Sequence, residues 1–156
     1  MFEKLMEIVA GFVAKDDLPP IGLEILSDKK LCSAALLVQM MVADGKIVQE
    51  EEDKLLSVLQ QHYGLSGDEA SQLAAKAKLV QAESVDFFRF TNALKGSMSI
   101  EEREGLVEDL WEIVYADGEL HEFEDNLVWR MAELLNISSE RRLALKRLVR
   151  KRAGGS

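Results

Sequence analysis

Apolar residues recur at intervals of three and four along most of this chain, which is the spacing of an amphipathic helix. Residues 31–43 differ, because they contain only two polar side chains and so predict a helix that is buried centrally or faces a partner. No segment alternates apolar and polar residues as a half-buried strand does. Further helices are predicted over residues 2–13, 49–63, 67–82, 84–95, 100–116, 121–135 and 140–152. The sequence therefore predicts an all-α protein, a bundle of seven or eight helices.

Local signals mark the ends of several helices. Gly64 is expected to end the helix before it, because glycine accepts the left-handed conformation of a C-terminal cap. Ser66 with Glu69, and Ser99 with Glu102, have the spacing of capping boxes, in which each side chain bonds a backbone N–H group at the start of the helix. We therefore expect helices to start close to residues 67 and 100.

Two consecutive prolines, Pro19 and Pro20, end the first helix, since proline lacks a backbone N–H group and restricts the residue before it. A length of 156 residues suits a single main domain. We divide the chain into an N-terminal amphipathic helix with a proline linker (residues 1–21), a helical domain (residues 22–152) and a flexible tail (residues 153–156).

One short segment occurs twice in the chain, 73 residues apart. Residues 42–47 (VADGKI) recur as residues 115–120 (YADGEL), and each copy lies between two predicted helices. In such a turn glycine accepts a positive φ and aspartate can accept backbone hydrogen bonds. A single helix pair cannot bury its apolar face alone. We therefore expect two pseudo-symmetric helix–Asp-Gly turn–helix repeats that pack against each other.

Each Asp-Gly turn is followed by a glutamate near the start of the next helix. Asp44 with Glu51, and Asp117 with Glu124, reproduce the second half of a calcium-binding loop. In that loop the residue before the glycine, and a glutamate six positions after it, are ligands. The ligand positions of the first half hold apolar or aromatic residues, so neither turn is a complete EF-hand.

Two interpretations of these acids remain open. In the first they stabilise a helical corner, because an acid near a helix N-terminus interacts favourably with the helix dipole. In the second the turns bind a divalent cation through carboxylate oxygens, which suit calcium or magnesium. The ligands would be Asp44, Glu51, Asp117 and Glu124, with Glu119, His121 and Glu122 as additional candidates.

The second copy of the repeat and its flanks resemble a bacterial family. The similarity is carried by residues 110–120 (LWEIVYADGEL), Glu124, Leu127, residues 131–135 (MAELL), Ile137 and Ser138. These residues closely resemble the tellurite resistance protein B-like (TerB-like) family, and Asp44-Gly45 with Glu51 agrees in the first copy. The resemblance extends over residues 25–150. It implies an all-helical, duplicated bundle with an acidic surface, associated with tellurite and stress resistance and with metal sensing or binding.

The net charge of −9 combines two regions of opposite sign. Residues 1–140 carry 28 acids against 12 bases, whereas residues 141–156 carry seven bases and no acid. An acidic body repels phosphate backbones, so we expect no nucleic-acid binding by the body. For the basic tail, contact with an anionic membrane or a nucleic acid stays open as an alternative.

Two charged stripes of opposite sign have helical spacing. The acidic stripe comprises Glu104, Glu108 and Glu112, and the basic stripe comprises Arg142, Lys146 and Arg150. One hypothesis is that the tail docks on the acidic face, within the chain or in a homodimer. Because exposed ion pairs contribute only ~0–1 kcal/mol each, Leu145, Leu148 and Val149 would have to supply most of the docking energy. The alternative is two independently solvated faces.

The remaining reactive or aromatic residues are interpreted as structural. Cys32 is expected to be a small core residue, and a single cysteine excludes an internal disulfide. His62 is expected at a helix end, where it can interact with the terminal carbonyl groups. Aromatic residues at helical spacings are expected to line the core or a groove, namely Phe87, Phe88, Phe90, Trp111 and Trp129.

The sequence contains no glycine-rich phosphate loop, nucleophile elbow or His-Glu-x-x-His run, so we expect no enzyme. No segment reaches the ~18 apolar residues of a transmembrane helix, and no secretory signal is evident. We therefore expect a cytoplasmic, TerB-like stress-response module with acidic turns that are able to bind a divalent cation. The alternative is a metal-free scaffold or dimerisation module that contacts a protein partner.

Overall fold

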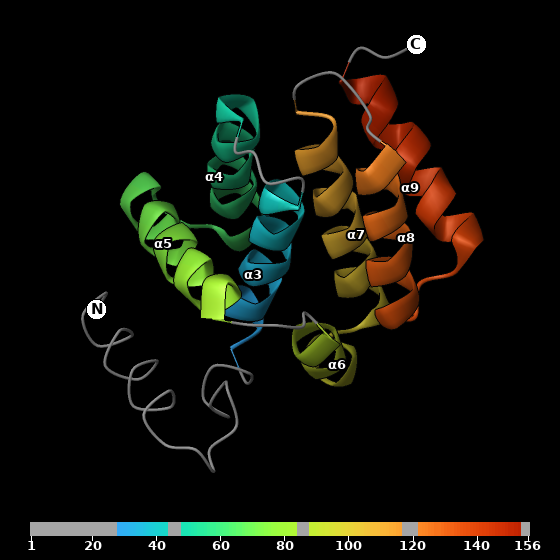
Figure 1. Ribbon diagram of the computed structural model, residues 1–156, viewed down its shortest axis with the longest axis horizontal. Helices are drawn as coiled ribbons and strands as arrows, with labels where there is room; N and C mark the ends of the chain where they lie inside the picture. Colours follow the sequence, from blue (N-terminus) through green and yellow to red (C-terminus); the bar gives the residue numbers. More distant parts are fainter. Residues whose placement is uncertain (1–27, 44–47, 84–87, 117–121, 154–156) are drawn as a thin grey trace.

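The computed structural model describes residues 28–43, 48–83, 88–116 and 122–153, which form seven helices and no strand (Figure 1). In chain order these are α3 (Lys29–Val42), α4 (Gln49–Tyr63), α5 (Gly67–Glu83), α6 (Phe88–Ser97), α7 (Ile100–Val114), α8 (Glu122–Leu134) and α9 (Ser139–Arg152). The predicted all-α class is confirmed. The expected helix at residues 2–13, the proline linker and both Asp-Gly turns lie outside the described residues.

The predicted helix caps are present. Gly64 ends α4 in the left-handed region, with φ of 64°. At the start of α7, Ser99 and Glu102 form a reciprocal capping box. Ser66 and Glu69 form the same pair of bonds at the start of α5, at 2.9 and 3.1 Å. These contacts are local in sequence, which explains why the residue pattern was sufficient to predict them.

Helix α3 occupies the centre of the molecule. It contacts α4, α5, α6, α7 and α8, and the side chains from Leu31 to Val38 are all buried (Figure 1). A helix that is surrounded by neighbours needs an apolar surface on every side. The central position of α3 explains why residues 31–43 contain only two polar side chains. Of the two alternatives, a centrally buried helix or a helix that faces a partner, the structure shows the first.

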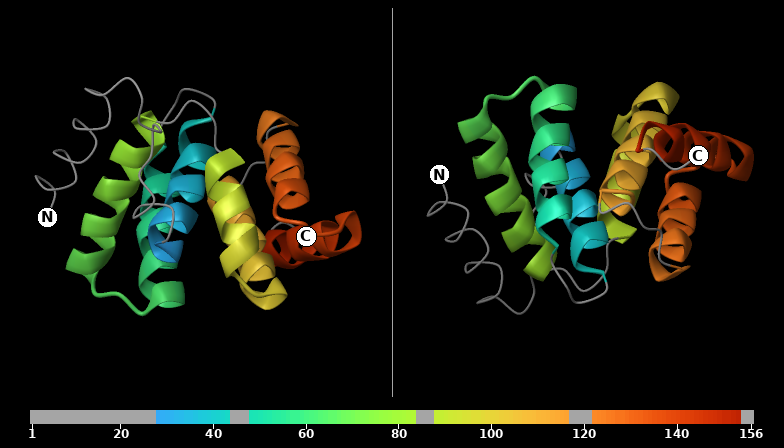
Figure 2. Two further views of the ribbon diagram at one scale, coloured as in Figure 1. Left: turned by 90° about the horizontal axis from the view of Figure 1, so that it is seen from below. Right: turned by 90° about the horizontal axis from the view of Figure 1, so that it is seen from above.

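The helices form two groups of three, α3–α5 and α7–α9, which meet where α3 and α4 contact α7. In the second group, α8 and α9 cover α7 on the side away from α3, and α9 runs across α8 (Figure 2). Helix α6 lies at one end and contacts α3 and α8 (Figure 1). The cavity between α4, α7 and α9 depends on this meeting of the two groups.

The turns after α4 and α8 have the same backbone form. Gly64 and Asn136 both lie in the left-handed region, with φ of 64° and 63°. In each turn the next residue donates its N–H group to a carbonyl five positions earlier, Leu65 to Gln60 at 3.2 Å and Ile137 to Ala132 at 2.8 Å. This is the hydrogen bond of a Schellman motif. The internal repeat itself stays a prediction, since its Asp-Gly turns are not described.

The aromatic residues do not all lie in the core. Trp111 and Phe90 are fully buried, as expected, but Trp129 on α8 is 41% exposed. Trp129 therefore does not lie in the core, which was one of the two positions expected for it. The core-facing side of α8 is already filled by Leu127, Val128 and Met131, which leaves Trp129 on the outer side of the helix.

Candidate functional site

Two of the predicted cation ligands hold matching positions in the two groups of helices. Glu51 is the third residue of α4 and Glu124 is the third residue of α8, and their exposed fractions are only 4% and 3%. Glu122, at the first position of α8, is exposed. The other candidates lie outside the described residues, namely Asp44, Asp117, Glu119 and His121.

Among the acids that the structure describes, only Glu51, Glu124 and Asp109 are buried. Removing a carboxylate from water is costly unless hydrogen bonds or an opposite charge compensate it. A position in the first helical turn supplies part of that compensation through the backbone N–H groups and the helix dipole. Within the described ranges, no group of three or more histidine, cysteine, aspartate or glutamate residues has the geometry of a metal site.

The acidic stripe of α7 faces the C-terminal helix α9. Arg141 bonds Glu104 through Nε at 3.1 Å, and Arg152 bonds both Glu108 and Glu112 through Nη2, at 2.6 and 2.8 Å. The apolar contact beneath these ion pairs comes from the buried Leu145 and Val149. Docking of α9 on α7 within one chain is therefore what the structure shows.

The basic residues at this interface are not those of the predicted stripe. Arg142, Lys146 and Arg150 do not bond the three glutamates; Lys146 bonds Asp125 on α8 at 2.7 Å instead. The side chain of Leu148, expected at the interface, is 46% exposed. The reason is geometric, because Leu145 and Val149 define the buried face of α9. Arg141 lies four residues before Leu145 and Arg152 three residues after Val149, which places both on that face of the helix.

Trp111 joins α7 to α9 at the centre of this interface. Its Nε1 donates a hydrogen bond of 3.2 Å to the carbonyl oxygen of Arg142. The Nζ atom of Lys146 lies 5.3 Å from the centroid of the same ring, within the range of a cation–π contact. Two residues of the predicted basic stripe therefore contact a buried tryptophan of α7 rather than its acids.

His62 of α4 forms an ion pair with Asp109 of α7, which is buried. The hydrogen bond that His62 donates to Asp109 raises the pKa of His62, and the nearby Glu108 and Glu112 act in the same direction. Burial raises the pKa of Asp109 to about 6, although its bond to His62 opposes this effect. The pair links the two groups of helices. The pair was not predicted from the sequence, although Asp109 lies between Leu106 and Ile113 on the buried face of α7.

The stability of this pair should depend on pH, and Asp109→Asn tests it. With a pKa raised in the folded state, Asp109 contributes stability that is present at low pH and lost as the pH rises through about 6. The raised pKa of His62 acts in the same direction above pH 6.5. Because asparagine resembles the protonated carboxyl group, the variant should gain stability relative to the wild type, on the order of 2 kcal/mol between pH 4 and pH 7.

Urea unfolding at pH 4, 5, 6, 7 and 8 measures this difference. Glu101→Gln, the same kind of change at an exposed residue of α7, is the matched control and should show no such trend. A difference between the wild type and Asp109→Asn that stays constant over this range would contradict the expectation.

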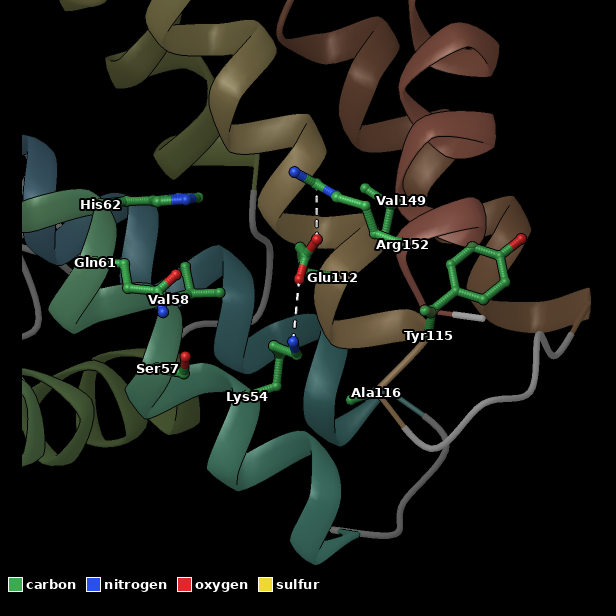
Figure 3. Close-up of a pocket in the computed structure, with 11 residues that line it drawn as sticks. Lys54, Ser57, Val58, Gln61, His62, Glu112, Tyr115, Ala116, Val149 and Arg152 are labelled. Carbon is green, nitrogen blue, oxygen red and sulfur yellow. Dashed lines mark hydrogen bonds and ion pairs between the residues drawn. The ribbon is translucent and has the colours of Figure 1, made fainter. Parts of the chain in front are cut away.

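A cavity of about 620 Å³ opens between α4, α7 and α9 (Figure 3). Glu112 lies between Lys54 of α4 and Arg152 of α9, at 3.2 and 2.8 Å from their nitrogen atoms. His62 lines the same cavity. These residues come from three helices that are far apart in the sequence, and no sequence pattern connects them.

Other predicted features have simpler outcomes. Cys32 is buried, and burial raises its pKa to about 12, so its thiol is a core group rather than a nucleophile. Across the described ranges, no helix is both long and apolar enough to cross a membrane.

Comparison with known proteins identifies the family. The family model of tellurite resistance protein TerB matches residues 30–147, which cover α3 to most of α9. Comparisons with curated proteins and with solved structures gave no match. The matched range spans both groups of helices and agrees with the resemblance seen in the sequence. This chain therefore belongs to the TerB family of tellurite resistance proteins.

Proposed function

We propose that this chain is a non-enzymatic, cytoplasmic stress-response module whose two acidic turns bind a divalent cation. The observation that carries the proposal is the burial of Glu51 and Glu124 at the same position of α4 and α8. Each follows an Asp-Gly turn in the sequence. Membership of the TerB family supports the association with tellurite resistance.

Calcium and magnesium fit this set of donors best. Asp44, Glu51, Asp117 and Glu124 offer carboxylate oxygens, which hard cations prefer, and the chain has only one cysteine, which is buried. A bound cation would also offset the cost of burying the two glutamates, because it supplies an opposite charge. Cation binding and the stability of the two turns should therefore be coupled.

Calorimetric titration of metal-free protein with calcium, magnesium, zinc and manganese tests the proposal. We expect saturable heat from calcium or magnesium. Loss of one ligand in Asp117→Asn or Glu124→Gln should weaken that binding at least about tenfold. Glu101→Gln removes the same charge from an exposed position of α7 and should leave the affinity unchanged.

Two results would contradict cation binding at the turns. One is the absence of heat with all four metals, and the other is identical heat from the wild type and Asp117→Asn. Either result would favour the metal-free interaction module, because the fold and the family assignment do not depend on a cation.

A further inference from the structure

The cavity between α4, α7 and α9 is not explained by the proposed cation site. Its volume of about 620 Å³ lies within the range of small-molecule pockets. It is lined by described residues of three helices, and none of them is one of the acids predicted to bind a cation at the turns. The lining contains three basic side chains, Lys54, His62 and Arg152, and one acidic side chain, Glu112.

Two of these basic groups converge on one carboxylate. Lys54 approaches Glu112 from α4, and Arg152 approaches it from α9, so that Glu112 lies between them (Figure 3). Arg152 also bonds Glu108. Glu112 therefore occupies the place between two cations that an anionic group of a ligand would take.

Both basic groups retain donors for a ligand. The ion pairs of Arg152 use only Nη2, and within the described part of the chain its Nε and Nη1 make no hydrogen bond. Lys54 carries three N–H donors and forms one ion pair, with Glu112. Their side chains are 49% and 36% exposed, so a ligand can reach them from solvent.

The rest of the exposed lining is mainly polar. Ser57 and Gln61 of α4 contribute polar groups to it. Val58 of α4 and Val149 of α9 also line the cavity, but their side chains are only 3% and 1% exposed. The cavity is therefore suited to a small polar molecule, because it offers little apolar surface.

We propose that this cavity binds a small polar molecule that carries a phosphate or carboxylate group. Arg152 and Lys54 bind the anionic group, and Ser57 and Gln61 offer polar contacts to the rest of the molecule. The planar guanidinium suits this role, because it can bond two oxygen atoms of a phosphate or carboxylate at once. The ligand replaces Glu112 at the two basic groups, so Glu112 competes with it.

Titration of the full chain with phenyl phosphate, followed by ¹H–¹⁵N NMR in buffer freed of metal ions, tests this proposal. We expect saturable shifts confined to the residues around the cavity. Inorganic phosphate and benzoate serve as separate arms. Binding of inorganic phosphate would show that the anionic group alone is recognised, and benzoate distinguishes a carboxylate site from a phosphate site.

Two variants should change the affinity in opposite directions. Arg152→Gln should weaken phenyl phosphate binding about tenfold, since it removes the main donor group. Glu112→Gln should strengthen binding severalfold, because it removes the internal competitor. Arg150→Gln, which changes an exposed arginine of α9 outside the cavity, is the matched control and should have no effect.

The proposal would be overturned by the absence of saturable shifts up to about 10 mM phenyl phosphate, a concentration that detects even weak millimolar binding. Equal effects of Arg152→Gln and Arg150→Gln would also overturn it. A change in affinity for Glu112→Gln keeps the proposal testable if Arg152→Gln fails to fold. Asp117→Asn should not affect this titration, so the cation proposal and this one can fail independently.

Discussion

Replacement of Trp111 by alanine should lower the free energy of unfolding by about 3–5 kcal/mol, a large part of the ~5–15 kcal/mol typical of a domain. The side chain is fully buried in α7. Alanine would leave a cavity against α9 and remove the hydrogen bond to the carbonyl oxygen of Arg142. It would also remove the aromatic ring beneath Lys146.

Urea unfolding followed by circular dichroism measures this effect. Trp129→Ala is the matched control, because it makes the same chemical change on the exposed side of α8. We expect its cost to stay below about 1 kcal/mol, as is usual when a surface residue is changed. Equal losses of stability in the two variants would contradict the placement of Trp111 at the centre of the interface.

Removal of residues 141–156 should abolish the cooperative thermal transition or lower its midpoint sharply. The deletion takes away almost all of α9, including the buried Leu145 and Val149, whose burial contributes ~1.5–3 kcal/mol each. It also exposes Trp111 of α7 to water. The three ion pairs to Glu104, Glu108 and Glu112 are lost at the same time.

Thermal unfolding of the full and shortened chains, with size-exclusion chromatography of both, tests this prediction. The double variant Arg141→Gln with Arg152→Gln is the control, because it removes the ion pairs and keeps the apolar contact. Since exposed pairs contribute only ~0–1 kcal/mol each, its loss should be small. Unchanged stability after truncation would show that α9 does not support the fold. An equally large loss of stability in the double variant would show that α9 stabilises the fold through its ion pairs and not through its apolar contact.

Helix bounds and caps could be predicted from the sequence because they depend on residues close together in the chain. Gly64 ends α4 as expected, and the capping boxes at Ser66 and Ser99 start α5 and α7. Residues 49–63 form a helix over the predicted range. Such signals act within one turn of a helix, so the rest of the fold has little influence on them.

The partners of charged residues could be predicted only in part. The stripe of Glu104, Glu108 and Glu112 does face basic residues of α9, but these are Arg141 and Arg152. Spacing by four positions shows which residues share a face of a helix, and it does not show which face is buried. Burial of Leu145 and Val149 decides that question, because apolar burial outweighs the exposed ion pairs.

Of the candidate sites, one could be predicted from the sequence and the other could not. The acids near the Asp-Gly turns were found from a repeat in the sequence, and the structure adds that Glu51 and Glu124 are buried. The cavity lined by Lys54, Glu112 and Arg152 was not found, because its residues come from three separate helices. Each lies at an ordinary position of an amphipathic helix, so no local pattern distinguishes it.

The sequence alone determined the helical class, the ends of most helices and the family resemblance, because periodicity, capping and motifs are properties of neighbouring residues. Only the tertiary structure decided that α3 is central, that Trp111 is covered by α9 and that His62 meets the buried Asp109. These contacts join residues that are far apart in the chain. They form when helices pack their apolar faces together, and the polar groups at the edges of those faces then take the partners that lie within reach.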